Sequence, residues 1–194
     1  VEGTNHPVST VFLPDLIEHL RAAGHLPTGM SPECQAYLEA EMSLADLDGS
    51  VFADTTSSDS ATEAQSQEPS PIIKSDALAE VPVDLIGATL NWLHRTKPVD
   101  GAILCFLPGW DEIQAVQEYV EPLLQSSTAP YKLYILHSAG PAAASDELFT
   151  RTPAFRKIIL ATNIAESSIT VPDAVYVVDA AKQKTTFYDA RHRM

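Results

Sequence analysis

Apolar runs and helical spacings alternate along the carboxyl-terminal part of the chain. The runs are nearly continuous in apolar residues, which is typical of strands buried on both faces of a sheet. This rhythm predicts an α/β fold, a mainly parallel sheet covered by helices on both faces. We expect strands at Gly101–Leu107, Tyr131–His137, Arg156–Thr162 and Asp173–Asp179, an edge strand at Lys184–Tyr188, and helices at Val83–His94, Asp111–Leu124, Ser145–Thr150 and just after Asn163.

The amino-terminal 45 residues predict a short strand, Val8–Leu13, and two helices, Asp15–Ala23 and Pro32–Ala45. The pattern is lost over Asp46–Ser75, which is rich in Asp, Glu, Ser, Thr and Gln. A segment with so little to bury does not offset the entropy cost of ordering it. We expect 46–75 to be a disordered acidic insertion between 1–45 and 76–194, the alternative being a recognition segment that orders on a protein partner.

The net charge of −14 is concentrated in one part of the chain. Residues 1–80 hold 14 of the 26 acidic residues and only two of the 12 basic ones, Arg21 and Lys74. Binding of nucleic acid or membranes by bulk electrostatics is therefore disfavoured by that segment, whereas the rest of the chain is nearly neutral.

Other classes are excluded by composition. The two cysteines, Cys34 and Cys105, lack metal-ligand spacing, so no metal site is predicted. No apolar run reaches the ~20 residues of a membrane span, and no signal peptide opens the chain. We expect an intracellular protein, with the cytoplasm ahead of the nucleus and the mitochondrion. Since the chain starts at Val1 and stops after Arg-His-Arg-Met, we also expect an excised piece of a longer protein.

Candidate chemistry lies just after the strands, because parallel sheets bind ligands at the carboxyl ends of their strands. Three turns there, 107–111, 137–138 and 161–170, offer small, hydroxyl and amide groups that suit phosphate oxygens. In the third turn, spacing alone favours a helix capped by Thr162 or Asn163, with Glu166 closing a capping box.

The third turn, ATNIAESSIT followed by VPDAVYVVD, closely resembles motif V and the next strand of DEAH-box helicases of superfamily 2. In addition, GAILCFLPGWDEI resembles motif IV of that family and LYILHS its motif IVa, in the family's order. The opening VEGTNHPVSTVFL resembles the passage between the two RecA-like domains of such proteins. The resemblance is close over 101–194 and at the amino end, and it is absent between about residues 24 and 75.

The resemblance implies a second RecA-like lobe of an ATP-dependent RNA helicase that moves 3′ to 5′. The phosphate-loop pattern GxxxxGK[ST] and the DEAH string are absent from the 194 residues, and motif VI would follow Met194. ATP and Mg²⁺ would therefore be held mainly by the first lobe, and the piece alone would not hydrolyse ATP. The implied partners are single-stranded RNA, bound through its backbone, and the first lobe and carboxyl-terminal domains of the same parent chain.

The resemblance also assigns site residues, none of them catalytic. Ser167 stands where the family usually has Thr. Two positions after Thr170, where many members have an acidic residue, this sequence has Pro172, followed by Asp173. Arg191 and Arg193 precede the place of motif VI and are not assigned catalysis. The RNA contacts implied are Pro108, Gly109, His137, Ser138, Thr162 and Asn163, and the residues of the nucleotide cleft and its coupling are Glu166, Ser167, Ser168 and Thr170.

Some alternatives remain open at the level of sequence. Trp110 either packs on its helix, which we favour, or stacks on a base. Cys105 is expected to be buried and unreactive, and Asp179 to make structural or interlobe contacts. The parent is either a DEAH-type helicase, which we favour, or an RNA-binding pseudohelicase or scaffold. An unrelated α/β nucleotide-binding domain is a weaker third possibility.

Overall fold

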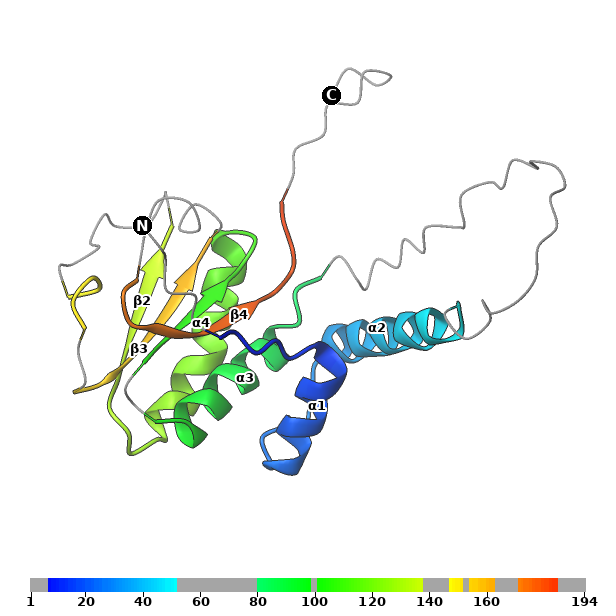
Figure 1. Cartoon of the computed structure of the whole chain (residues 1–194), viewed down its shortest axis with the longest axis horizontal. Coiled ribbons are helices and arrows are strands. Elements are labelled where there is room, and N and C mark those ends of the chain that lie inside the picture. The colour runs from blue at the N-terminus through cyan, green and yellow to red at the C-terminus, as the bar shows by residue number, and fades with distance from the viewer. Residues whose placement is uncertain are drawn as a thin grey trace, which may run out of the picture. The chain divides into compact units, whose positions relative to one another are not determined.

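The computed structural model describes residues 7–51, 80–98, 101–137, 147–151, 154–162 and 171–184, shown as coloured ribbon in Figure 1. The chain divides into two compact units, one made of Val1–Gly29 with Val83–Met194 and the other of Met30–Pro82. The larger unit carries the sheet and every candidate site residue described below.

The larger unit is built on a sheet of four parallel strands in the order β2-β3-β1-β4. In this order β3 pairs with β2 on one side and with β1 on the other, while β4 pairs with the far side of β1. The predicted parallel α/β architecture is confirmed, and all four predicted strands are present. Their bounds are β1 Ala102–Phe106, β2 Tyr131–Leu136, β3 Arg156–Ala161 and β4 Ala174–Asp179.

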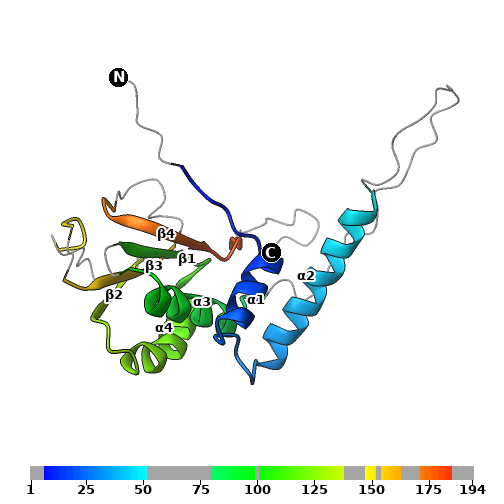
Figure 2. The ribbon, with the colours of Figure 1, turned by 60° about the horizontal axis from the view of Figure 1, so that its bottom comes forward.

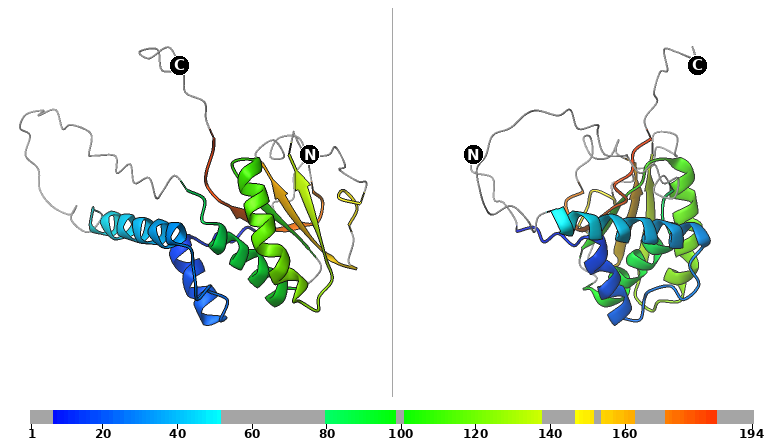
Figure 3. Two further views of the ribbon diagram at one scale, coloured as in Figure 1. Left: turned by 180° about the vertical axis from the view of Figure 1, so that it is seen from behind. Right: turned by 90° about the vertical axis from the view of Figure 1, so that its right-hand side faces the viewer.

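Two helices, α3 (Val83–Thr96) and α4 (Trp110–Gln125), pack side by side along the sheet (Figures 2 and 3). The apolar face of α4 predicted from its spacing is fully buried at Ile113, Val116, Val120 and Leu124. The helices approach closely at Gly87, where an added Cβ would lie 2.8 Å from Cε1 of the Tyr119 ring. Glycine is therefore what lets this pair of helices pack together.

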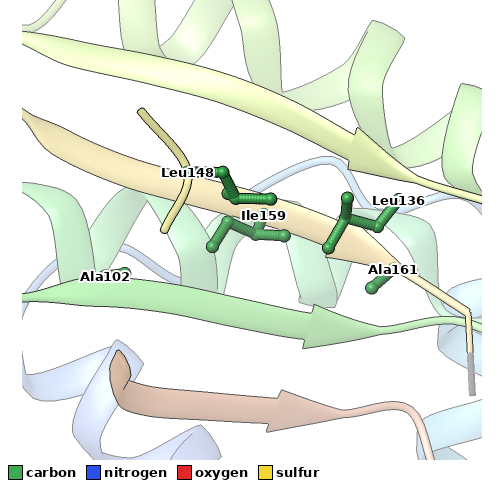
Figure 4. Close-up of a cluster of buried hydrophobic side chains, with 5 residues drawn as sticks. All are labelled: Ala102, Leu136, Leu148, Ile159 and Ala161. Atoms are coloured by element: carbon green, nitrogen blue, oxygen red, sulfur yellow. The ribbon is translucent and has the colours of Figure 1, made fainter. Parts of the chain in front are cut away.

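The core is centred on β3, whose six residues are all buried. A side-chain cluster on one face of the sheet joins the strands where β3 lies between its neighbours (Figure 4). Residues paired across parallel strands point to the same face, which explains how Leu136 meets Ala161. The cluster consists of Ala102, Leu136, Leu148, Ile159 and Ala161.

Two buried cations, Arg156 and Lys157, begin the central strand β3. The Arg156 guanidinium donates hydrogen bonds to the carbonyls of Lys97 and Gly101, at 2.8 and 2.9 Å, and to that of Pro98. These bonds satisfy carbonyls of the connection from α3 to β1. The amino end of β3 is thus tied to that connection by charge-assisted hydrogen bonds.

The amino-terminal elements differ in part from the prediction. Helix α1 (Leu13–Ala22) is present, but the strand expected at Val8–Leu13 is wrong, because residues 7–12 form no ladder and the helix already starts at Leu13. Pro14 in the first turn of α1 favours this early start. Helix α2 (Pro32–Val51) runs six residues beyond its predicted end, into the expected disordered insertion 46–75, so disorder was wrong for 46–51. Residues 52–75 of that insertion lie outside the described residues.

Two smaller expectations also meet the structure only in part. In place of the helix expected at Ser145–Thr150, the described residues 147–150 form a turn. Segments as short as six residues gain little from helix formation, because nucleation is costly. Lys184 is not in a strand, while the rest of the expected edge strand, 185–188, and the short helix after Asn163 lie outside the described residues.

Candidate nucleic-acid interface

The segments that follow the strands meet at one edge of the sheet. The amide of Leu107 donates to the Ala161 carbonyl at 2.8 Å, and the amide of Thr162 donates to the Leu136 carbonyl at 3.2 Å. The amide of Ala180 reaches the Phe106 carbonyl at 3.2 Å in the same way. Each bond continues the pairing one residue past a strand, so the predicted candidate turns start side by side.

The turn after β1 leads directly into α4 through Pro108 and Gly109. Gly109 is the N-cap of α4, with extended backbone and no side-chain capping bond, and its carbonyl accepts from the amide of Ile113 at 3.1 Å. A Cβ at Gly109 would lie 2.8 Å from Oε2 of Glu112 and 2.9 Å from Nζ of Lys184. The absence of a side chain therefore leaves room for two long side chains to cross this turn.

The cation that crosses the turn is held by two carboxylates at the start of α4. Lys184 Nζ lies 2.9 Å from Glu112 Oε2 and 3.6 Å from Asp111 Oδ2. The hydrogen bond that Lys184 donates to Glu112, with the charges of both carboxylates, raises the pKa of Lys184. Both acids also lie where the helix dipole favours anions. Two carboxylates beside one lysine leave the turn at Gly109 with a net negative charge. Any phosphate bound there would be held by backbone N–H groups and not by positive charge.

A pocket of about 350 Å³ opens between the turn after β1 and the segment that follows β4. Its entrance is shaped by Ala181, which has a positive φ of 52° and whose amide donates to the Asp179 carboxylate at 2.8 Å. Asp179 thus makes a structural contact, one of the two kinds expected for it, and this contact stabilises the turn by which the chain leaves β4. The lining residues are Phe106, Leu107, Pro108, Val177, Asp179, Ala181, Lys182, Gln183 and Lys184.

His137, directly after β2, lies against Trp110, the first residue of α4. The ring centroids are 5.4 Å apart and the ring planes are inclined by 48°. Trp110 therefore packs on another part of the same edge of the sheet, in line with the favoured packing interpretation of its indole. The pair joins the turn after β1 to the end of β2.

Thr162 directly follows β3, between these two turns, and it is 3% exposed. Its hydroxyl oxygen is buried and finds no hydrogen-bond partner among the described residues. A buried hydroxyl without a partner costs about 1–3 kcal/mol, so this group calls for a partner outside the described part of the chain.

The remaining predicted site residues lie outside the described residues. They are Ser138 of the second turn and Asn163, Glu166, Ser167, Ser168 and Thr170 of the third. The structure therefore brings together four of the predicted residues, namely Pro108, Gly109, His137 and Thr162.

Sequence reasoning missed the segment 181–184, which lines the pocket and places Lys184 over Gly109. The available signal was two lysines, Lys182 and Lys184, directly after a strand end.

Cys105 lies inside β1 and is completely buried. Burial, with a smaller contribution from the Asp179 carboxylate, raises the pKa of its thiol to about 12. A thiol in this environment stays protonated and unreactive near neutral pH. The predicted burial of Cys105 is confirmed.

The described ranges hold neither a metal-binding cluster nor a membrane-spanning helix. No group of three or more His, Cys, Asp or Glu side chains there is arranged to hold a metal ion. Within the same ranges, none of the helices combines the length and apolar character needed to cross a bilayer.

Comparison with known proteins gives a consistent family. A family model described as the helicase conserved C-terminal domain matches residues 84–194. The DExH-box ATP-dependent RNA helicase DExH1 of Arabidopsis thaliana is 44% identical over 118 residues, which are 60% of this chain and 12% of that protein. The human ATP-dependent DNA/RNA helicase DHX36 is 39% identical over 116 residues, 59% of this chain and 11% of that protein.

A solved structure supports the same fold. The crystal structure of the E. coli DExH-box NTPase HrpB matches with a TM-score of 0.50 and 31% identity, over 58% of this chain and 13% of that one. The chain thus corresponds to only a small part of the length of each relative. Residues 84–194, which the family model matches, contain the four strands of the parallel sheet.

Proposed function

The chain belongs to the helicase conserved C-terminal domain family, in its DEAH/RHA-type branch with a RecA-like fold, and from this premise we propose how it acts. It serves as the second RecA-like lobe of an ATP-dependent RNA helicase of DEAH type. In that role it grips the RNA backbone at the carboxyl edge of its sheet and forms one wall of the ATP cleft. The parent acts inside the cell, with the cytoplasm as the first compartment to test.

The observation that carries the proposal is the meeting of three turns at one sheet edge. The bonds from Leu107 to Ala161 and from Thr162 to Leu136 hold the turns in register. Gly109 caps the start of α4 at this edge, in a turn that the Glu112 and Lys184 side chains cross, and His137 lies beside the same edge. Such small and neutral groups suit a sugar–phosphate backbone, which they contact without reading its sequence.

The RNA contacts we propose are distributed over all three turns. Pro108 and Gly109 bring backbone close to the strand, His137 and Ser138 offer side-chain donors, and the third turn adds the hydroxyl and amide groups. Few of these contacts neutralise phosphates, so the affinity of the chain for RNA will fall with salt along a shallow slope. The third-turn groups are Thr162 and Asn163.

The chain's own residues fit one wall of an ATP site and not a whole one. The sequence lacks the phosphate-loop pattern, and the described strand-end turns show Lys184 already paired with carboxylates. Bound with Mg²⁺ by the first lobe, ATP supplies the phosphoryl-transfer chemistry of the parent. This chain lines and couples the cleft through Glu166, Ser167, Ser168 and Thr170.

Two variants in a complete helicase that carries this lobe test the assignments. Thr162→Ala removes a hydroxyl proposed to grip RNA, and a lost neutral hydrogen bond of ~0.5–1.5 kcal/mol weakens affinity about 2- to 13-fold. Ser168→Ala leaves RNA binding intact and uncouples it from unwinding. RNA affinity, RNA-stimulated ATPase and duplex unwinding are measured in parallel, with ATPase without RNA as the control.

Two results would overturn this account. If both variants match the parent in all three assays, the motif V assignment is wrong and the cluster is a helix cap. If the complete protein binds RNA but never hydrolyses ATP, it is an RNA-binding pseudohelicase or scaffold.

A further inference from the structure

The contact between Trp110 and His137 bridges two turns that are not neighbours in the sheet. Because β3 lies between β1 and β2, the turns that follow β1 and β2 start about two strand spacings, ~10 Å, apart. The rings nevertheless have centroids only 5.4 Å apart. The aromatic pair therefore spans the end of β3, the position of Thr162.

The indole is on the more rigid side of this contact. Trp110 begins a helix of 16 residues whose next inward residue, Ile113, is fully buried, and the amide of Ile113 is bonded to Gly109. His137 follows β2 directly, next to the buried Leu136. The helix thus fixes the indole, and the indole limits the positions open to the imidazole.

The inclination of the two rings is that of a packing contact between aromatic groups. Aromatic pairs with centroids 4.5–7 Å apart and inclined planes gain free energy beyond their buried area. An indole held in such a contact with a protein ring is not free to open toward a base without giving that contact up. The contact therefore couples the position of the indole to that of the imidazole.

We infer that Trp110 is a positioning residue, whose indole holds the His137 imidazole over the end of β3 and so sets the turn that His137 begins. The inference rests on the proposed function, since it takes His137 as an RNA contact. The inference adds to the proposed function a role for Trp110, in the turn after β1, in positioning His137, which follows β2. The competing role, in which the indole stacks on a nucleobase, is an outcome of the test.

The first measurement needs no RNA. A nearby indole shifts the proton resonances of an imidazole through its ring current, so the His137 ring signals of the chain are compared with those of Trp110→Ala and Trp110→Phe. We expect a clear shift on Trp110→Ala and a smaller one on Trp110→Phe. Unchanged His137 signals in Trp110→Ala would overturn the inference.

The second measurement is a double-mutant cycle in RNA affinity, made with the 194-residue chain and a single-stranded oligouridylate. Trp110→Ala and His137→Ala each weaken RNA binding about 3- to 10-fold. The double variant binds RNA as tightly as the single variant that has the lower affinity. Trp110→Phe recovers most of the affinity. Trp92→Ala, which changes the other tryptophan on α3, leaves affinity unchanged and serves as the matched control.

An oligonucleotide of the same length without bases separates the two roles of Trp110. A positioning residue gives the same fold-loss on both ligands, whereas a stacking residue loses its effect on the ligand without bases. Additive losses in the cycle, or a loss seen only with bases, would overturn the inference and leave the proposed function standing. No RNA binding by the unmodified chain would overturn the proposed function itself.

Discussion

Lys157 at the start of β3 and Asp173 just before β4 form an ion pair of 3.0 Å although their side chains are only 1% and 6% exposed. The Lys157 ammonium also donates to the carbonyls of Leu148, at 3.1 Å, and Thr150. One buried cation thus joins the central strand to the turn at 147–150 and to the entry of the edge strand β4. The strands and turns that support the candidate interface depend on this pair.

Replacing Lys157 by Met is expected to lower the free energy of unfolding by about 3–5 kcal/mol. The substitution leaves the Asp173 carboxylate buried without its partner, and that is the costly way to break a buried ion pair. Urea unfolding followed by circular dichroism measures the change. Lys132→Met, which removes an exposed pair with Glu147, is the matched control and changes the unfolding midpoint little. A loss below about 1 kcal/mol for Lys157→Met would show that the pair does not support the fold.

Acid is expected to destabilise the larger unit partly through His94. The pKa of this residue is lowered from 6.5 by burial first and then by the charge of Arg156. A group whose pKa is lower in the folded state takes up a proton on unfolding, so its contribution to stability is complete above pH 6.5 and is lost as the pH falls below it.

The test is the melting temperature between pH 7.5 and pH 5 for the chain and for His94→Phe, which keeps a ring beside Tyr131. The variant is expected to lose less stability on acidification. Part of the dependence remains, because burial and Arg95 also lower the pKa of His25. Equal slopes for the two proteins would contradict the assignment to His94.

Cys105 is expected to resist thiol reagents in the folded chain at pH 8. Its pKa of about 12 and its complete burial leave almost no accessible thiolate. Iodoacetamide labelling with peptide mass spectrometry, with and without urea, reports Cys105 separately from Cys34. Labelling of Cys105 at the same rate with and without urea would show that β1 is not buried as described.

Gly87→Ala is expected to destabilise the chain, although the same change in an exposed helix stabilises by about 1 kcal/mol. The new methyl group would overlap the Tyr119 ring, and overpacking of this kind costs about 1–3 kcal/mol. Urea unfolding of Gly87→Ala, Tyr119→Ala and the double variant measures the coupling. We expect the loss in unfolding free energy of the double variant to be smaller than the sum of the losses of the two single variants. A stabilising Gly87→Ala would contradict the close packing of α3 on α4.

The sheet was predictable because each strand carries its own signal. The run 102–106 is apolar on both faces, and the helix that separates it from the next apolar run, 131–136, already indicates parallel strands. The segment Val8–Leu13 shows the limit of this reasoning. Its alternation is local, and no strand pairs with it in the described structure, whereas Pro14 starts a helix at its end.

The supporting contacts of the site were not predictable, because they depend on strand order. Nothing in the sequence places β3 between β1 and β2, so the contact of Trp110 with His137 was not predicted. The buried positions of Arg156 and Lys157 run against the usual exposure of charged residues. They are explained by carbonyls that both cations bond and by the Asp173 carboxylate that pairs with Lys157. The candidate turns themselves were visible as polar groups at strand ends.

The proposal that the carboxyl edge of the sheet binds RNA is tested most directly by mapping crosslinks. The 194-residue chain is irradiated with single-stranded RNA carrying 4-thiouridine, and the crosslinked peptides are identified by mass spectrometry. The account predicts crosslinks in the peptides that hold 107–111, 137–138 and 161–170, and their loss on competition with unlabelled RNA. Crosslinks confined to α1, α2 or the amino ends of the strands, or no crosslinks at all, would contradict it.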